Sequence, residues 1–326
     1  MQTRYSSIHI HVITIGGTNM IKLLIGGSPC TYWSIAQSHN RETTCEGQGW
    51  ELFKNYLFAK DLFKPDFFLY ENNCSASKEI KEEIEKSLDY KRIEFNSSLV
   101  SAQNRSRFYV TNIANVILPQ DKGIIVRDIL DDSSYNGKFY QISDKMSNKR
   151  PSKTGIKRVG IVNHSNSQGN RVYSIDGKAP TLTANGGGMG AKTGLFLMDN
   201  GDVRKLSVKE ARRLQTVPDY IKFNCSNTQI YKQLGNGWTI DVIKEFFKHL
   251  PKDEEIVVLS MYDGMSCGQI ALKELGLNIK TYIAVEIDKY CQDTIMTNFP
   301  NTILFSDAFD IRDKNSELYS YIENIK

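Results

Sequence analysis

Hydrophobic and polar positions along residues 21–114 alternate between two periods. The apolar runs IKLLIGG, DFFLY and FYVTNI have the length and composition of buried strands, whereas residues 50–62 and the charged segment KEIKEEIEKSL have a helical pattern. Strands that alternate with helices are typical of a mostly parallel sheet that is covered on both faces. This part of the chain is therefore predicted to form an α/β unit.

The same alternation returns in residues 204–326. Helical periodicity is found in SVKEARRLQ, for which Ser207 is a suitable N-cap, and again at residues 239–250. A strand, a helix and two further strands are then predicted in EEIVVLSMY, GQIALKELG, TYIAVEID and TILFSDAF. We predict that residues 21–114 and 204–326 are two parts of a single α/β domain.

Residues 115–203 differ in character from both parts. They are rich in Gly, Ser, Asn, Lys and Arg and have no sustained helical period, which predicts a separate, loop-rich subdomain. Residues 1–20 alternate only weakly, and Met20 directly precedes the first strong strand pattern. Two interpretations are open for them: a disordered extension ahead of a true start at Met20, or an edge strand at residues 8–15.

Composition narrows the class of protein only modestly. The chain of 326 residues is 40% apolar, which is enough for a full core, and its net charge of +4 is compatible with a polyanionic partner without requiring one. The six cysteines include no CxxC pair and no histidine at metal-ligand spacing, so we predict free thiols in a reducing cytoplasm and no metal. No apolar run approaches the roughly 20 residues of a membrane-spanning helix, so no membrane association is predicted.

A turn of small and acidic residues, MYDGMSCG, joins a predicted strand to a predicted helix near the carboxyl terminus. Such a turn lets a ligand approach the backbone beside the positive end of the helix, although a purely structural turn has the same pattern. The next strand ends at Glu286, whose carboxylate could accept hydrogen bonds from both hydroxyls of a ribose, and the third ends at Asp307. Because no GxxxxGK[ST] loop is present, an adenosine-containing cofactor without a phosphate chain is predicted.

Chemically reactive side chains follow the strands near the amino terminus. The first strand leads into Ser28-Pro29-Cys30, so a thiol is presented at a strand end, where open α/β sheets bind ligands. An electropositive environment would make Cys30 a nucleophile, whereas a buried, inert cysteine is the alternative. The next strand ends in Glu71, and Arg105 and Arg107 lie two residues apart on an extended segment, where they could hold a carboxylate, a phosphate or a base oxygen.

The order of these segments resembles a known family. GGSPC, YENN, QNRSRFY, KLSVKEARRLQTVPDYIKF and YKQLGNGW are similar to signature blocks of the cytosine carbon-5 DNA methyltransferases, and SMYDGMSCG, AVEID and SDAF to their S-adenosylmethionine blocks. Because the family usually begins with the cofactor blocks, the chain resembles a circular permutant of bacterial or phage type. The resemblance implies a Rossmann-like, S-adenosylmethionine-dependent methyltransferase fold with residues 115–203 as a target-recognition subdomain.

The resemblance also implies roles for single residues. Cys30 would attack carbon 6 of a cytosine flipped out of duplex DNA, and Glu71 would stabilise protonation at ring nitrogen 3. Arg107 would contact the base oxygen and help to position Glu71, with Arg105 alongside. The residues implied for S-adenosylmethionine are Pro29, Asn236, Trp238, Tyr262, Asp263, Gly264, Met265, Ser266, Gly268, Glu286, Ile287, Asp307 and Ala308. Those implied for DNA are Ser28, Asn72, Gln103, Lys149, Arg150, Lys153, Arg171, Thr183, Asn185 and Gly186.

The implied recognition region contains a basic stretch that is opposed by a single acid, Asp144. Such a stretch can neutralise DNA phosphates, although a solvated charge run has the same composition. Its members are Lys138, Lys145, Lys149, Arg150, Lys153, Lys157 and Arg158. Farther on, RVY and APTLTANGGG resemble the core of this region in bacterial and phage members. Duplex DNA is the expected partner of a monomeric enzyme, with a cognate restriction endonuclease as a further partner.

The predicted function is thus that of a DNA (cytosine-5-)-methyltransferase in restriction-modification or phage self-protection. Thr31 stands where glutamine usually follows Pro-Cys, and YENN replaces the commoner Glu-Asn-Val, which we expect to affect target preference more than activity. Three alternatives are open: an RNA (tRNA) methyltransferase with the same cysteine chemistry, a catalytically silent DNA-binding relative, and an unrelated nucleotide-dependent enzyme.

Overall fold

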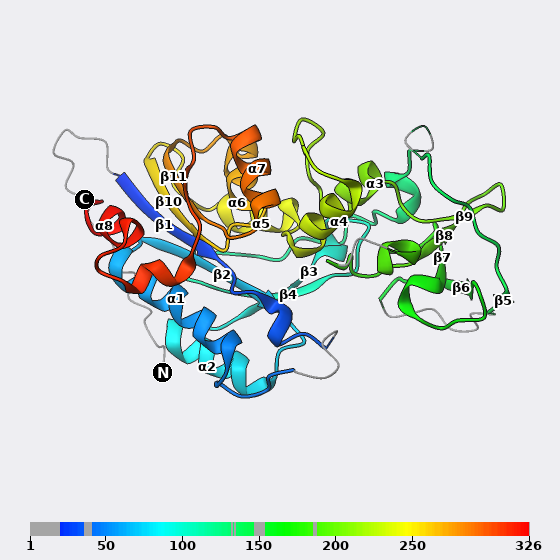
Figure 1. Cartoon of the computed structure of the whole chain (residues 1–326), viewed down its shortest axis with the longest axis horizontal. Coiled ribbons are helices and arrows are strands. Elements are labelled where there is room, and N and C mark those ends of the chain that lie inside the picture. The colour runs from blue at the N-terminus through cyan, green and yellow to red at the C-terminus, as the bar shows by residue number, and fades with distance from the viewer. Residues whose placement is uncertain are drawn as a thin grey trace, which may run out of the picture.

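The computed structural model describes residues 20–35, 41–131, 133, 135–146, 154–184 and 188–325. Residues 8–15, for which an edge strand was considered, lie outside this part of the chain. Figure 1 shows a larger α/β part, which contains both ends of the described chain, and a smaller part made of short strands. The α/β fold class that the alternating pattern predicts is confirmed.

The larger part is built on one sheet of seven strands. Their spatial order is β12 (Ile303–Phe305), β11 (Ile279–Val285), β10 (Glu255–Met261), β1 (Met20–Gly26), β2 (Phe67–Asn73), β4 (Ser106–Thr111) and β3 (Ile93–Asn96). β1 pairs in parallel with β10 on one side and with β2 on the other. The strands near the carboxyl terminus therefore continue the sheet that the first strands begin.

The sheet is mixed, because one strand runs against its neighbours. The predicted parallel arrangement is confirmed for β12, β11, β10, β1 and β2. β4 is antiparallel to both β2 and β3, which the sequence pattern did not predict. The cause is a short connection: residues 97–105 join β3 to β4 without a crossover α-helix, and a parallel pair needs a longer link.

Two layers of helices cover the sheet. α1 (Gln48–Phe63), α2 (Lys78–Leu88) and α8 (Glu317–Glu323) share one hydrophobic core with Leu24 of β1. α5 (Ile240–Phe247), α6 (Cys267–Glu274) and α7 (Lys289–Asn298) share the other with Leu23 and Ile25. Because successive residues of a strand point to opposite faces, the unbroken apolar run of β1 fills both cores.

Two further helices connect the smaller part to the larger. α3 (Val208–Leu214) begins where predicted: Ser207 Oγ accepts a hydrogen bond from the Glu210 amide at 3.2 Å, and Glu210 Oε2 accepts one from the Ser207 amide at 2.7 Å. α4 (Asn227–Asn236) follows and ends at the GNGW turn. None of the described helices has both the length and the apolar character needed to span a membrane.

The smaller part contains a second sheet of five short strands. Their order is β5 (Asp144–Lys145), β6 (Arg158–Ile161), β7 (Arg171–Ser174), β8 (Leu195–Leu197) and β9 (Val203–Arg204). Tyr173 and Phe196 from this sheet pack in one cluster with Leu206 and with Leu214 of α3. This shared cluster attaches the smaller part to the larger one.

Candidate active site

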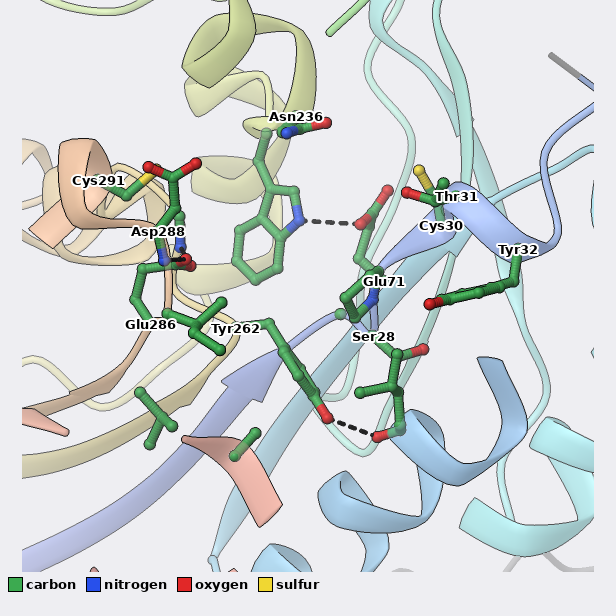
Figure 2. Close-up of a pocket in the computed structure, with 18 of the residues that line it drawn as sticks. Ser28, Cys30, Thr31, Tyr32, Glu71, Asn236, Tyr262, Glu286, Asp288 and Cys291 are labelled. Atoms are coloured by element: carbon green, nitrogen blue, oxygen red, sulfur yellow. Dashed lines mark hydrogen bonds between the residues drawn. The ribbon is translucent and has the colours of Figure 1, made fainter. Parts of the chain in front are cut away.

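A cavity of about 560 Å³ lies at the carboxyl ends of the central strands. Figure 2 shows Cys30 and Glu71 on one side of it and Glu286 and Asp288 on the other. The two sides come from opposite ends of the chain, and they meet because β1 pairs with β10. The structure brings together these predicted residues: Ser28, Pro29, Cys30, Glu71, Arg105, Arg107, Asn236, Trp238, Tyr262, Gly264, Glu286, Ile287, Asp307 and Ala308.

Buried polar side chains of β2 form hydrogen bonds with the loop that carries Cys30. Asn72 Nδ2 donates to the Ser28 carbonyl at 2.9 Å and to the Tyr70 hydroxyl at 3.1 Å, and the Ser28 hydroxyl lies 2.7 Å from the Tyr70 hydroxyl. Asn73 Nδ2 donates to the Cys30 carbonyl at 3.4 Å. Ser28 and Asn72, both predicted DNA contacts, are buried and support the cysteine loop, and Ser28 also lines the cavity.

The Glu71 carboxylate is held at both oxygens. Arg107 Nε lies 3.0 Å from Oε1, and Trp238 Nε1 donates to Oε2 at 2.9 Å. Arg107 reaches Glu71 because β4 runs antiparallel to β2, which sets Arg107 opposite Asn73. Gly27 leaves the necessary room, since a Cβ at that position would lie 2.5 Å from the Glu71 carbonyl oxygen. The strand pairing, rather than the local sequence, thus brings Arg107 to this acid.

Arg105 has a different environment from Arg107, although both line the cavity. It is 3% exposed, and its guanidinium donates to the carbonyls of Leu182 at 3.1 Å and of Gly235 and Gly237 at 2.9 Å. Burial and the nearby Arg107 lower the pKa of Arg105. These hydrogen bonds from Arg105 connect the smaller part of the molecule to the GNGW turn.

We expect the substitution Arg105→Met to lower the free energy of unfolding by about 3–5 kcal/mol, because it removes the donor from the buried Leu182 and Gly235 carbonyls and one of the two donors from Gly237. Urea unfolding followed by circular dichroism measures this change. Arg107→Met is the matched control, since Arg107 is less buried, and its loss should be about 1 kcal/mol. Equal urea midpoints for Arg105→Met and the unsubstituted chain would contradict this structural role of Arg105.

The opposite wall of the cavity is acidic. Glu286 Oε2 accepts from the Gly264 amide and Oε1 from the Asp288 amide, each at 2.7 Å, and burial raises the pKa of Glu286. Asp307 accepts from the Phe309 amide at 2.9 Å, at the start of the short helix η7 (Ala308–Arg312). With Glu71 and Asp288, these side chains place four carboxylates in the lining against two guanidinium groups. Such a lining favours a ligand that carries positive charge and hydroxyl donors.

Four predicted cofactor residues of the MYDGMSCG turn are buried and are not in the cavity lining: Asp263, Met265, Ser266 and Gly268. Asp263 Oδ1 accepts from Ser260 Oγ at 2.5 Å and from the Tyr282 hydroxyl at 2.7 Å. Burial raises the pKa of Asp263 to about 6, and its Oδ2 has no hydrogen-bond partner within the described residues. Gly268 allows close packing, because a Cβ there would lie 2.2 Å from Ile25 Cδ1.

The predicted DNA contacts are only partly within the described chain. Gln103 is completely buried: its Nε2 donates to Gln215 Oε1 at 3.1 Å and its Oε1 accepts from the Leu182 amide at 2.7 Å, so it faces no solvent. Arg171 and Thr183 are half-buried in the smaller part. Lys149, Arg150, Lys153, Asn185 and Gly186 lie outside the described residues. The predicted basic stretch is therefore described only at its two ends.

Several residues of the cavity lining were not predicted from the sequence. Asp288 and Phe309 directly follow predicted positions, so proximity to the motifs was a usable signal for them. Gln48, Leu52 and Cys291 come from helices that pack beside the cavity, and no motif marks them. Among the described residues, no group of three or more His, Cys, Asp and Glu side chains could hold a metal ion.

Comparisons with known proteins agree on one family. A family model described as C-5 cytosine-specific DNA methylase matches residues 4–252. The chain is similar to Type II methyltransferase M.HhaI of Haemophilus parahaemolyticus, with 32% identity over 247 residues that cover 68% of this chain and 73% of that protein. Type II methyltransferase M.Bsp6I of Bacillus sp. is 27% identical over 254 residues, covering 71% and 78%. Type II methyltransferase M.FnuDI of Fusobacterium nucleatum is 28% identical over 274 residues, also covering 71% and 78%.

Proposed function

Because the chain belongs to the C-5 cytosine-specific DNA methylase family, we propose that it transfers a methyl group to carbon 5 of cytosine in duplex DNA. One observation carries the proposal: a thiol, Cys30, and a firmly held carboxylate, Glu71, share a cavity with the strand-end acids Glu286 and Asp307. The first pair suits chemistry on a base, and the second suits a cofactor with hydroxyls and a positive charge. Both are needed for methyl transfer.

In the proposed reaction the cytosine is flipped out of the duplex, because its ring carbons are inaccessible within the stack. The Cys30 thiolate forms a bond to carbon 6, and the electron pair of the ring double bond moves toward nitrogen 3, where Glu71 supplies a proton. Carbon 5 thereby becomes nucleophilic. After methylation, loss of the proton from carbon 5 and release of Cys30 restore the aromatic ring.

We propose S-adenosylmethionine as the cofactor, which supplies an electrophilic methyl group when bound. Glu286 would accept hydrogen bonds from the ribose hydroxyls, and Asp307 would accept one from the adenine amino group. The fit is supported by the acidic lining, which complements a cationic ligand. Gly264, whose amide holds Glu286, leaves the backbone open to close approach.

Binding of S-adenosylmethionine is expected to weaken as the pH falls from 7.5 to 5.5. Burial raises the pKa of Glu286 in the lining and brings that of Asp263, which lies behind it, to about 6, so this wall takes up protons and loses negative charge as the pH falls. A ligand that needs the ionised carboxylates must displace those protons, which lowers its affinity by up to about tenfold per pH unit for each group below its pKa. Isothermal titration calorimetry at several pH values measures the trend.

The control is Glu286→Gln, which removes one of the titrating groups. It should bind the cofactor more weakly at pH 7.5 and should lose part of the pH dependence. An affinity of the unsubstituted chain that stays constant from pH 7.5 to 5.5, with the fold intact by circular dichroism, would contradict this account of the acidic wall.

We further propose that the chain is a circular permutant of its family. The pairing of β10 with β1 supports this, because strands with the cofactor motifs lie beside the strand that leads to Cys30. The closeness of the two ends of the described chain supports it as well (Figure 1). Lys22 Nζ, near one end, donates to the Ile325 carbonyl at the other at 2.8 Å. A short link between these ends would restore the family's usual order without disturbing the sheet.

Residues 115–203 are proposed to recognise the DNA target, and a role in restriction-modification or phage self-protection is proposed for the enzyme. The Type II methyltransferase relatives support that role. The experiment that tests the function is transfer of labelled methyl from S-adenosylmethionine to a random-sequence duplex library, followed by detection of 5-methylcytosine. Transfer to RNA alone, or cofactor binding without any transfer, would refute the proposal.

A further inference from the structure

Trp238 lies between the two halves of the cavity. It is the last residue of the GNGW turn at the end of α4, lines the same cavity as Glu286, and donates its indole N–H to Glu71 Oε2 at 2.9 Å. Figure 2 draws this bond as a dashed line that ends on the Glu71 carboxylate. The family resemblance accounts for the ring as part of the cofactor site, but the contact with Glu71 is a separate feature.

The backbone on both sides of Trp238 is anchored, so the indole is presented in a defined place. The Gly237 amide donates to the Gln233 carbonyl at 2.8 Å, and the Gly237 carbonyl accepts from Arg105 at 2.9 Å. The Thr239 hydroxyl donates to Gln215 Oε1 at 2.8 Å. The turn therefore has little freedom to move the ring away from Glu71.

The two donors on Glu71 are complementary. Arg107 Nε occupies Oε1 and the Trp238 indole occupies Oε2, and neither group can accept a proton from the carboxyl. Each carboxyl oxygen has a further lone pair, which stays available for a proton shared with a base. Without the indole, one oxygen would lose its hydrogen-bond donor. The carboxyl plane could then rotate about χ3, a torsion angle that has a broad distribution in glutamate.

We propose that Trp238 is a positioning residue for the base chemistry, and that its N–H orients the Glu71 carboxyl toward ring nitrogen 3 of the flipped cytosine. This inference rests on the proposed function. It assigns the indole two separable tasks: the N–H acts on Glu71, and the ring surface forms part of the cofactor wall. Each task can be removed without the other.

Two substitutions separate the tasks. Trp238→Phe keeps an aromatic ring but removes the N–H, whereas Trp238→His keeps an N–H at the equivalent ring position, Nε2, but removes the outer ring. The first readout is release of tritium from carbon 5 of cytosine in a random-sequence duplex, measured without cofactor, because this exchange needs attack at carbon 6 and proton transfer only. The second readout is the dissociation constant of S-adenosylmethionine from calorimetry.

We expect Trp238→Phe to slow the exchange by about 10- to 100-fold, the usual effect of losing a hydrogen bond to a charged group, with the dissociation constant changed less than threefold. Trp238→His should keep exchange within about threefold of the unsubstituted chain and should weaken cofactor binding. The reverse pattern, with exchange intact in Trp238→Phe, overturns the inference and makes the ring a cofactor wall only.

Two controls keep the outcome decisive. If Trp238→Phe unfolds, site-specific incorporation of 3-benzothienylalanine at this position replaces the N–H by sulfur in a ring of nearly the same shape, and the same loss of exchange is expected. If the unsubstituted chain shows neither exchange nor methyl transfer on DNA, the proposed function fails. If it shows both and the benzothienyl chain exchanges at full rate, the inference fails while the proposed function stands.

Discussion

Replacing Cys30 by serine is expected to abolish methyl transfer and also the covalent trapping of the chain on duplex DNA that contains 5-fluorocytosine. The thiolate is a far stronger nucleophile at neutral pH than a serine hydroxyl, and the proposed reaction cannot begin without the bond to carbon 6. Fluorine at carbon 5 cannot leave as a cation, so the adduct that Cys30 forms should persist and migrate more slowly in denaturing gels. We expect a loss of activity of about 10³-fold or more.

The matched control for Cys30→Ser is Cys45→Ser. Cys45 is also a free, partly buried thiol, but it does not line the cavity, and burial raises its pKa to about 11. Its replacement should leave transfer and trapping unchanged. Adduct formation by Cys30→Ser, or loss of the adduct in Cys45→Ser with the fold intact, would show that another group forms the covalent bond.

The positions of the strand-end acids could be predicted from local sequence. The apolar runs of β2 and β11 stop at Glu71 and Glu286, and in a parallel sheet such strand ends converge on one edge. Both acids line the cavity for this reason. The burial of Asn72 follows from the same pattern, because alternation along β2 puts it on the face opposite to Glu71, beside Tyr70.

Long-range contacts could not be predicted in this way. The bond from Trp238 to Glu71 joins residues 167 positions apart, and no periodicity relates a turn after α4 to the end of β2. Arg105 and Arg107 have similar sequence environments, yet one is bonded to three carbonyls and the other to a carboxylate. Their difference arises from which backbone segments pack against β4, and that is a property of the assembled fold.

Glu71→Gln is expected to reduce the turnover number by about 10²- to 10⁴-fold, the range associated with loss of a positioned acid. The amide cannot supply the proton to ring nitrogen 3, and its NH₂ group would face either the Trp238 or the Arg107 donor, so one of the two hydrogen bonds is lost as well. Binding of S-adenosylmethionine should change little. Single-turnover kinetics and calorimetry measure the two effects separately.

The control for Glu71→Gln is Glu94→Gln, which alters an exposed acid of β3 that pairs with Arg92 and should leave turnover unaffected. A double substitution tests how Arg107 acts. If Arg107 works partly by orienting Glu71, then Arg107→Met should cost less in the Glu71→Gln background than in the unsubstituted chain. Equal costs in both backgrounds would mean that Arg107 contributes independently, through the base oxygen, and that the ion pair has no part in orienting the acid.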